Sequence, residues 1–367
     1  MSKSEDQFDQ WYVKSSFQEF VHREGVPLYE GSALEDMATL ALGDWERRGG
    51  KCAYTRLGNQ EQSYNLQIIE IPPKGELKPE HHMYEAIMYV MQGRGATTVW
   101  QEGEPKRTIE WEEGALLTIP LNAWHQEFNA SSDAPCRILF CTNMPYVINW
   151  FHNLEYVFNN PFVFKDRYSF DQQDFFTGEG KHWRHRTFET NFVADIRQVP
   201  LDENPVRGHR HKVQRLSMAG TNIGIHIAEV QVGTYMTAHR HGPGAHVITV
   251  DGKGYEILFM PGDEKNRRKI PLKPYTVISP VLNEFHQHFN VGTTPFKMLA
   301  FRGIGIRYGW GREYTRVSPT AQTKDPFAES LNISYEQEDP VIREEYYREL
   351  EKIGIHSKLP PVSQGRT

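Results

Sequence analysis

Residues 233–254 read GTYMTAHRHGPGAHVITVDGKG, and the fold is best argued outward from this stretch. A short strand ends in His239-Arg240-His241, a glycine-proline loop follows, and an alternating apolar strand then runs into a G-x-G turn. Residues two apart on a strand point to the same face, so the imidazoles of His239 and His241 aim in one direction. The stretch therefore predicts a sheet that carries histidines on its inner face.

Two further histidines extend this pattern. His246 follows the glycine-proline loop, and His286 comes from a later strand about forty residues on. Imidazoles this far apart in sequence can converge only in a closed sheet that brings distant strands together. We expect His239, His241, His246 and His286 to bind one divalent transition metal. Neutral imidazoles suit Fe(II), Mn(II), Ni(II), Cu(II) or Zn(II) and hold calcium or magnesium poorly.

Alternatives remain for individual positions. His246 is either the fourth ligand or a group that contacts the ligands or the substrate. His288 has the same face parity as His286 and is the rival for its ligand position. His288 and Glu284 are also the candidates for a catalytic role in proton transfer.

The same pattern occurs twice in the chain. Three blocks of the first half return in the same order about 160 residues later, which indicates gene duplication and two like domains. The paired blocks are 66–82 (LQIIEIPPKGELKPEHH) with 225–241 (IHIAEVQVGTYMTAHRH), 88–100 with 247–259, and 114–129 with 275–290.

Short strands punctuated by Gly, Pro, Asn and Asp favour an all-β fold of antiparallel sheets closed into two barrels or jelly rolls. A helix is expected only in a short aromatic-rich connector and near the C-terminus, where residues 340–353 begin with Pro and end before Gly354. The predicted organisation is an N-terminal arm (1–45), a first barrel domain (46–146), the connector (147–205), a second barrel domain (206–312), and a C-terminal helix and tail (313–367).

These residues resemble the cupin superfamily. Its first motif runs Gly, five residues, His-x-His, three or four residues, Glu, six residues, Gly, and its second runs Pro, four residues, His, three residues, Asn. His246 stands nearest the place of the family's glutamate, which this repeat lacks. The residues of the second repeat that match are Gly233, His239, His241, the 252–254 turn, Pro280, His286 and Asn290, with one extra residue between Pro280 and His286.

The resemblance extends to the first repeat. The position of the family's first histidine is Glu80 when the repeat is aligned on Gly93, and His81 when it is counted from Gly75. The resemblance implies a second candidate metal site at His82, Glu85 and His125; the alternative is a metal-free barrel kept for packing. The matching residues are Gly75, His82, Glu85, Gly93, Pro120, His125 and Asn129.

What the resemblance implies is a bicupin, two tandem jelly-roll barrels with a metal in the mouth, loosely similar to gentisate-type ring-cleaving dioxygenases. It covers about 200 of the 367 residues and is specific to the fold rather than the reaction, because one fold hosts many functions.

Composition excludes several other classes. The formal net charge of −6 and the pI near 6.3 provide no positive field for nucleic acid. The polar N-terminus does not read as a secretory signal, and no apolar stretch predicts a membrane span. The three cysteines, Cys52, Cys136 and Cys141, are expected to be buried free thiols, so a cytoplasmic location is predicted.

The favoured function is an oxidoreductase that uses non-haem Fe(II) and O2 on a small, metal-chelating phenolic, hydroxy- or keto-acid. One alternative is a metal-dependent isomerase, lyase or decarboxylase without redox chemistry, and another is a cupin that binds a small ligand without catalysis. The partners expected are the substrate and further copies of the chain, in a homodimer or higher homo-oligomer, because the long terminal arms suit the covering of sheet edges.

Overall fold

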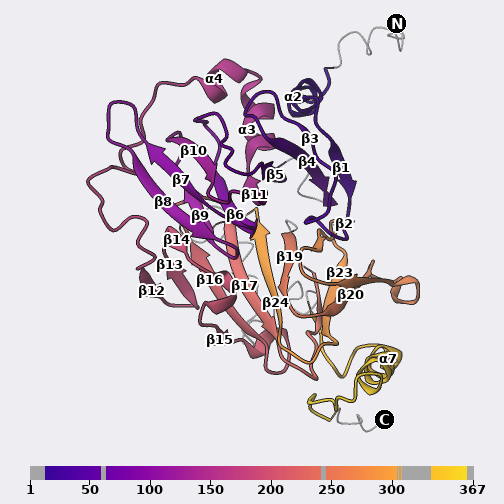
Figure 1. The fold of residues 1–367 in the computed structure, drawn as a ribbon. Helices are drawn as coiled ribbons and strands as arrows, with labels where there is room; N and C mark the ends of the chain where they lie inside the picture. The colour runs from indigo at the N-terminus through magenta and orange to yellow at the C-terminus, as the bar shows by residue number, and fades with distance from the viewer. Residues whose placement is uncertain are drawn as a thin grey trace, which may run out of the picture.

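The computed structural model describes residues 13–58, 63–240, 245–303, 305, 307 and 332–361. In this part of the chain, two β-barrels lie against each other with a few helices at the periphery, as Figure 1 shows. The all-β class with two tandem barrels, a short helical connector and a C-terminal helix is confirmed.

The first barrel has a large sheet and a small one. Its strands are β1 (Leu28–Gly31), β3 (Gly43–Asp44), β4 (Lys51–Leu57), β5 (Asn65–Ile71), β6 (Ala86–Gln92), β7 (Arg94–Trp100), β8 (Arg107–Glu112), β9 (Leu116–Ile119), β10 (Trp124–Asn129), β11 (Cys136–Thr142) and β14 (Phe192–Val193). The large sheet runs β1-β4-β5-β11-β6-β9-β14 with β3 beside β4, and the small sheet runs β10-β7-β8.

The second barrel is built in the same way. Its strands are β2 (Ala33–Leu34), β12 (Lys181–Trp183), β13 (Thr187–Glu189), β15 (Asp202–Glu203), β16 (Lys212–Ser217), β17 (Gly224–Val230), β18 (Ala238–His239), β19 (Ala245–Asp251), β20 (Gly254–Phe259), β21 (Arg268–Leu272), β22 (Val277–Ile278), β23 (Phe285–Asn290), β24 (Phe296–Arg302) and β25 (Asn332–Ile333). The large sheet runs β12-β13-β16-β17-β24-β19-β22-β2 with β15 beside β16, and the small sheet runs β21-β20-β23-β18-β25.

The two barrels can be superimposed strand by strand. The order β4-β5-β11-β6-β9 returns as β16-β17-β24-β19-β22. Both barrels carry a β-bulge at the same place, where the extra residue is Met91 on β6 and Val250 on β19. Asn129 and Asn290 end equivalent strands. The side-chain amide of Asn129 donates to three backbone carbonyls and that of Asn290 to two, which ties the following turn to a neighbouring strand. These anchors allow positions in one barrel to be compared with those in the other.

A glycine is required in the same turn of each barrel. Gly93 and Gly252 adopt φ of +90° and +81°, a region that L-residues with a side chain rarely occupy. A Cβ at Gly93 would lie 2.7 Å from the Cβ of Cys136, and one at Gly252 would lie 2.7 Å from the carbonyl oxygen of Pro295. The two G-x-G turns of the sequence are therefore turns in which the backbone itself is closely packed.

Each repeat also contributes a strand to the other barrel. β2, from the N-terminal segment, pairs with β22 of the second barrel, while β14, from the connector, pairs with β9 of the first. Two short edge strands are thereby exchanged reciprocally, which covers a sheet edge in each barrel. The predicted domain boundaries stay a prediction, but the arm and the connector both take part in the sheets.

The strands of the large sheets separate two kinds of core. Ile87, Tyr89 and Met91 on β6, and Ile248 and Val250 on β19, point outward into an apolar layer between the barrels. The intervening residues point into the barrel lumen. In the first barrel the lumen is packed with apolar side chains, whereas in the second the apolar cluster is smaller.

The helices lie at the two ends of the molecule. α2 (Ser16–Glu24), α3 (Met144–Phe151) and α4 (Leu154–Phe158) lie beside the first barrel, and α7 (Pro340–Glu351) packs on the second (Figure 1). α7 begins where the sequence predicts, with Asp339 accepting a hydrogen bond from the backbone of Val341. Its apolar face covers the outer face of β20 and β23. Short 3-10 turns span Ile196–Gln198, Pro205–Arg207 and Glu264–Asn266.

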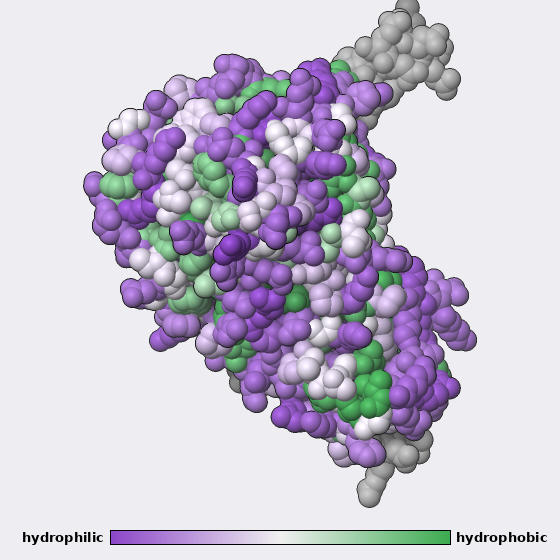
Figure 2. All heavy atoms as spheres, viewed as in Figure 1, coloured by the Kyte–Doolittle hydropathy of each residue, from purple (hydrophilic) through white to green (hydrophobic). Residues whose placement is uncertain are grey.

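The surface of the molecule is mostly hydrophilic. Figure 2 shows polar side chains over most of the visible face and smaller apolar patches, one of them beside α7. Among the described helices, none has both the length and the hydrophobicity to cross a bilayer. Cys52, Cys136 and Cys141 are buried and unpaired with one another, which confirms the prediction of free thiols.

Candidate metal centres

Three histidines converge in the lumen of the second barrel. His239 on β18 and His286 and His288 on β23 each present a ring nitrogen, and these nitrogens all lie within 4.8 Å of one another. The ring centroids of His239 and His286 are 4.2 Å apart, and all three side chains are buried. This histidine group is the strongest candidate metal centre of the second barrel.

Strand pairing explains how the group forms. His239 lies directly opposite His286 in the antiparallel pair of β18 and β23. His286 and His288 are two residues apart, so both point into the lumen, while Phe285 and Phe289 point outward toward α7. The alternation of β23 therefore places two imidazoles inside and two phenyl rings outside.

Hydrogen-bond acceptors behind the rings orient two of these imidazoles. Nδ1 of His239 lies 2.9 Å from the carbonyl oxygen of Thr237, and Nδ1 of His288 lies 3.1 Å from Oε2 of Glu256. The Glu256 contact is an ion-pair distance rather than a well-aligned hydrogen bond. An acceptor at Nδ1 keeps the proton there and leaves the Nε2 lone pair free for a metal, the arrangement typical of ligating histidines.

The donor set fits a divalent transition metal. Burial lowers the pKa of His286 well below its usual value, and nearby His288 and Arg207 lower it further. The ring is therefore neutral near pH 7, as a ligand must be. A group of three imidazole ligands suits Fe(II), Mn(II), Ni(II), Cu(II) or Zn(II).

The first barrel holds a group of different composition. Glu80, His82 and His125 present ligand atoms within 4.8 Å of one another. Nδ1 of His82 lies 2.8 Å from the Tyr84 carbonyl oxygen, and Nδ1 of His125 lies 2.6 Å from Oε1 of Glu127. The two Nε2 atoms face each other at 3.3 Å. Nitrogens bound to one metal at about 2.1 Å are separated by roughly 3.0 to 3.4 Å, so this spacing fits a metal between them.

Two arginines neutralise Glu80. Its carboxylate accepts hydrogen bonds from both Arg47 and Arg48, and Arg48 also donates to Glu127 at 2.6 Å. Burial would raise the pKa of Glu80, but the guanidiniums of Arg48 and Arg47 hold it well below its usual value. Burial and the neighbouring His125 lower the pKa of His82 to about 3. The group combines one carboxylate with two imidazoles, the ligand types of non-haem iron sites.

Little space remains around this group. The cavity beside it has no room for a water molecule, and it is lined by His82, His125, Phe140 and residues of the packed lumen. The ring of Phe140 lies 6.1 Å from that of His125. A larger surface groove lies along the connector, but none of the candidate ligands lines it.

Two predicted ligands lie outside these groups, for the same reason. Glu85 lies two residues before Ile87 of β6 and therefore points to the same, outward face. Its carboxylate accepts hydrogen bonds from the backbone and side chain of Asn222. His246 precedes Ile248 on the outward face of β19. Both side chains therefore enter the layer between the barrels, and the carboxylate of the first group is Glu80, at the position equivalent to His239, rather than Glu85.

Two further predictions have different outcomes. The carboxylate of Glu284 accepts hydrogen bonds from Arg268 at 2.6 Å and from the backbone of Val281 at 3.0 Å, so it stabilises a turn. His241 lies outside the described residues, and its role stays a prediction.

The sequence reading missed the partners of the ligands. Glu127 and Glu256 support His125 and His288, and Arg48 neutralises Glu80. Extending the repeat alignment upstream of the first block would have paired Arg48 with Arg207, which is the one available signal.

Comparison with known proteins supports the fold. The family model described as "Cupin domain" matches residues 67–142, which lie within the first barrel. No curated protein matches the sequence.

Similar solved structures share low sequence identity with this chain. An oxalate decarboxylase is 13% identical, covering 82% of this chain and 86% of its own, with a TM-score of 0.48. Vicilin from Corylus avellana (hazelnut) is 13% identical over 74% and 84%, with a TM-score of 0.44. The 7S globulin of Momordica charantia is 14% identical over 74% and 83%, with a TM-score of 0.45.

The matched cupin domain accounts for the first barrel, and the second repeats its strand order and its β-bulge. The chain therefore contains a cupin domain at residues 67–142, and a second barrel of the same strand order follows it.

Proposed function

We propose that this chain is a metal-dependent oxidoreductase whose reaction takes place in the second barrel. The metal is a divalent transition metal, Fe(II) in the favoured case, held by His239, His286 and His288. The substrate is a small metal-chelating phenolic, hydroxy- or keto-acid, with O2 as co-substrate. The observation that carries the proposal is the convergence of three buried imidazoles in one lumen.

The metal, when bound, supplies a coordination sphere in which a chelating substrate and O2 can meet. In a dioxygenation both oxygen atoms of O2 enter the substrate, so no separate reductant is consumed. The protein's part is to orient His239 through the carbonyl of Thr237 and His288 through the carboxylate of Glu256.

A second candidate function rests on Glu256 and His288. This buried pair can hold a proton at Nδ1 of His288 and exchange it with a bound substrate if His288 is not a ligand. Proton transfer of this kind suits a metal-dependent isomerase, lyase or decarboxylase. Product formed under nitrogen without O2 consumption would select this function over the oxidoreductase.

The first barrel is proposed to hold its metal, where one is bound, for structure rather than for reaction. Its cavity is narrow, and Phe140 packs near the ligand group. Glu80 is already engaged by two arginines. These features leave little room for a substrate beside His82 and His125.

Metal analysis of matched variants tests the proposal. Protein purified without added metal is compared with His286→Ala and with His125→Ala, the equivalent change in the first barrel. His286→Ala is expected to lose the metal of the second barrel and to lower turnover of an active phenolic or keto-acid by at least about 100-fold. His125→Ala is expected to keep that turnover. Unchanged metal content and O2 consumption in His286→Ala would refute the assignment.

The homo-oligomer and the cytoplasmic location stay predictions. Light scattering of the purified chain tests the former, since a monomer would contradict it.

A further inference from the structure

The second barrel lacks the two carboxylates that neutralise Arg48 in the first barrel. Lys78 donates its backbone N–H to the carbonyl of Arg48, and Thr237 donates in the same way to Arg207, so the two arginines occupy equivalent positions. In the first barrel Glu80 forms a backbone β-bridge with His125, and at the equivalent place in the second barrel His239 pairs with His286. Glu127 likewise corresponds to His288. Imidazoles thus occupy, in the second barrel, the two positions that hold the carboxylate partners of Arg48 in the first.

Two more arginines enter the same lumen. Arg302 on β24 shares a face with Met298, and Arg215 on β16 lies opposite the lumen-facing His226. By register, their counterparts in the first barrel are Thr142 and Tyr54, both neutral and buried. By the same register, Ala300 of the second barrel occupies the position of Phe140 in the first. The second barrel therefore has no phenyl ring at this place near the metal ligands.

Among the described residues, no carboxylate contacts these guanidiniums, and the carboxylate of this lumen, Glu256, lies against His288 instead. The side-chain contacts found are one hydrogen bond from Arg207 to the amide oxygen of Asn332 and one from Arg215 to the carbonyl of His185. Burial, together with the guanidiniums of Arg302 and Arg215, lowers the pKa of Arg207 to about 10. Burial and Arg215 lower that of Arg302 to about 10. Positive charges held this close together without a carboxylate are costly unless an anion joins them.

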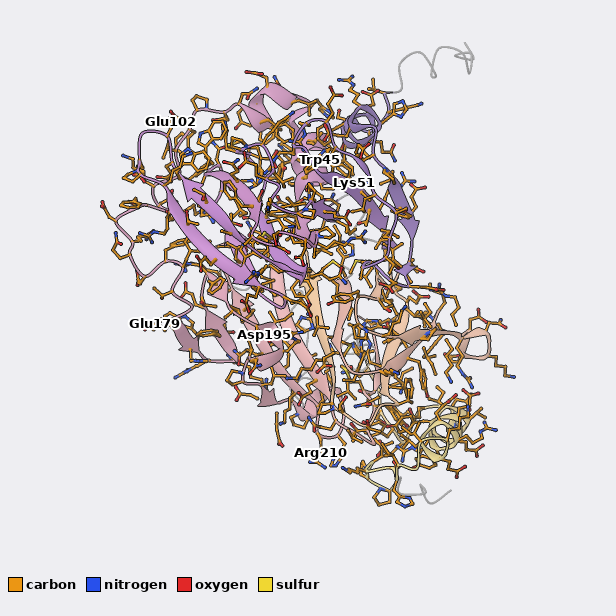
Figure 3. All side chains as sticks on the ribbon, in the orientation of Figure 1. Trp45, Lys51, Glu102, Glu179, Asp195 and Arg210 are labelled. Carbon is orange, nitrogen blue, oxygen red and sulfur yellow. The ribbon has the colours of Figure 1, made fainter. Side chains whose placement is uncertain are left out.

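The arginines lie near the histidine group and within reach of solvent. Arg207 and Arg302 both act electrostatically on His286. Arg207, Arg215 and Arg302 are half-buried, whereas the equivalent side chains Arg48, Tyr54 and Thr142 are fully enclosed. Figure 3 labels Trp45 in the upper barrel and Arg210 at the outer end of the lower one.

We propose that Arg207, Arg215 and Arg302 form an anion-binding subsite that holds the carboxylate of a small organic acid beside the histidine group. Guanidinium groups match carboxylates through paired hydrogen bonds, which is why three of them favour a carboxylate over a neutral ligand. The inference deepens the proposed function by naming the recognised group, but the subsite itself depends only on the arginines. The first barrel, with its arginines already neutralised, should bind no such anion.

Malonate and its neutral analogue malonamide provide the test. The full chain, metal-loaded and chelator-treated, is heated with increasing amounts of each compound. Malonate is expected to raise the melting temperature progressively in both preparations, and malonamide is not. Arg302→Gln and Arg215→Gln are expected to weaken malonate binding at least about tenfold in calorimetry, since each loses a charged hydrogen bond. Arg302→Lys should recover part of the affinity.

A matched control and a stability readout separate binding from structure. Arg94→Gln removes an exposed arginine of the first barrel and is expected to leave malonate binding unchanged. Without ligand, Arg302→Met is expected to melt at the same or a higher temperature than the parent, because it removes an uncompensated charge. A parent protein that malonate does not stabilise, or arginine variants that bind malonate normally, would overturn the subsite. If the chain binds malonate but takes up no metal, the anion-binding subsite is supported and the proposed function is contradicted.

Discussion

In the first barrel Arg48 donates hydrogen bonds to two carboxylates, Glu80 and Glu127, whereas in the second barrel, where Arg207 replaces Arg48, imidazoles of His239 and His288 occupy the positions of these carboxylates. Duplication produced one scaffold with one set of strand pairings. What differs is the lumen, which is closed and neutralised in one copy and half-open and positively charged in the other.

The difference separates stability from binding. A buried arginine with two carboxylates is satisfied within the protein, and so it contributes to a rigid core. An arginine without carboxylates costs free energy in the empty barrel and recovers it when an anion binds. The second barrel is therefore the copy whose composition is explained only by a ligand.

The largest expected effect comes from breaking the neutralised network of the first barrel. Glu80→Gln leaves Arg47 and Arg48 with too few acceptors and is expected to lower the free energy of unfolding by about 3 to 5 kcal/mol. Urea denaturation measures it. Glu30→Gln, which removes a partly exposed pair with Arg56, should cost less than about 1 kcal/mol. Equal losses in the two variants would contradict the comparison.

Exchanging a lumen residue between the barrels sharpens the comparison further. Ala300→Phe introduces the ring that fills the first barrel and is expected to lower malonate affinity at least about tenfold, with a stability cost of about 1 to 3 kcal/mol. Calorimetry and thermal melting read the two effects separately. Phe140→Ala serves as the reciprocal control, since it should destabilise the chain while leaving malonate affinity intact. Normal malonate binding by Ala300→Phe would show that malonate does not bind in this lumen.

The layer between the barrels has a pH dependence that can be assigned to His246. Burial lowers its pKa to about 4, so between an unfolded value of about 6.5 and pH 4 the unfolded chain binds a proton that the folded chain does not. Stability is complete above pH 6.5 and falls on acidification by up to about 1.4 kcal/mol per pH unit.

His246→Ile places in the second barrel the residue type of Ile87, its counterpart in the first. Relative to this variant, the parent is expected to lose about 2 kcal/mol between pH 6.5 and pH 5. Urea denaturation at both pH values measures the difference. Parallel pH profiles for the two proteins would place the acid sensitivity elsewhere.

The smallest effect concerns the helix that covers only the second barrel. Asp339→Ala removes the cap of α7 and is expected to cost about 1 kcal/mol of unfolding free energy. The helix packs on the outer face of β20 and β23, so hydrogen exchange should rise in these strands before it rises in β7 and β10. Uniform exchange in both barrels would show that α7 does not support the small sheet.

Much of the fold was accessible from the sequence because a repeated pattern is local information. Alternation predicted the lumen-facing strands, and the spacing of His239, His286 and Asn290 predicted the barrel. The same reasoning placed Glu85 and His246 among the ligands, although both belong to the outward face of their strands. Motif spacing counts residues along the chain and cannot tell which face a strand presents after a loop.

By itself, the sequence determined the duplication, the all-β class, part of each group of candidate ligands and the C-terminal helix, since each follows from periodicity or from residue types at short range. Only the tertiary structure decided which carboxylate joins which histidine, which strands the two repeats exchange, and that one lumen is neutralised while the other is not. These are properties of pairs of residues far apart in the chain, and their energies depend on burial and on the charge of neighbours that only the closed barrels bring together.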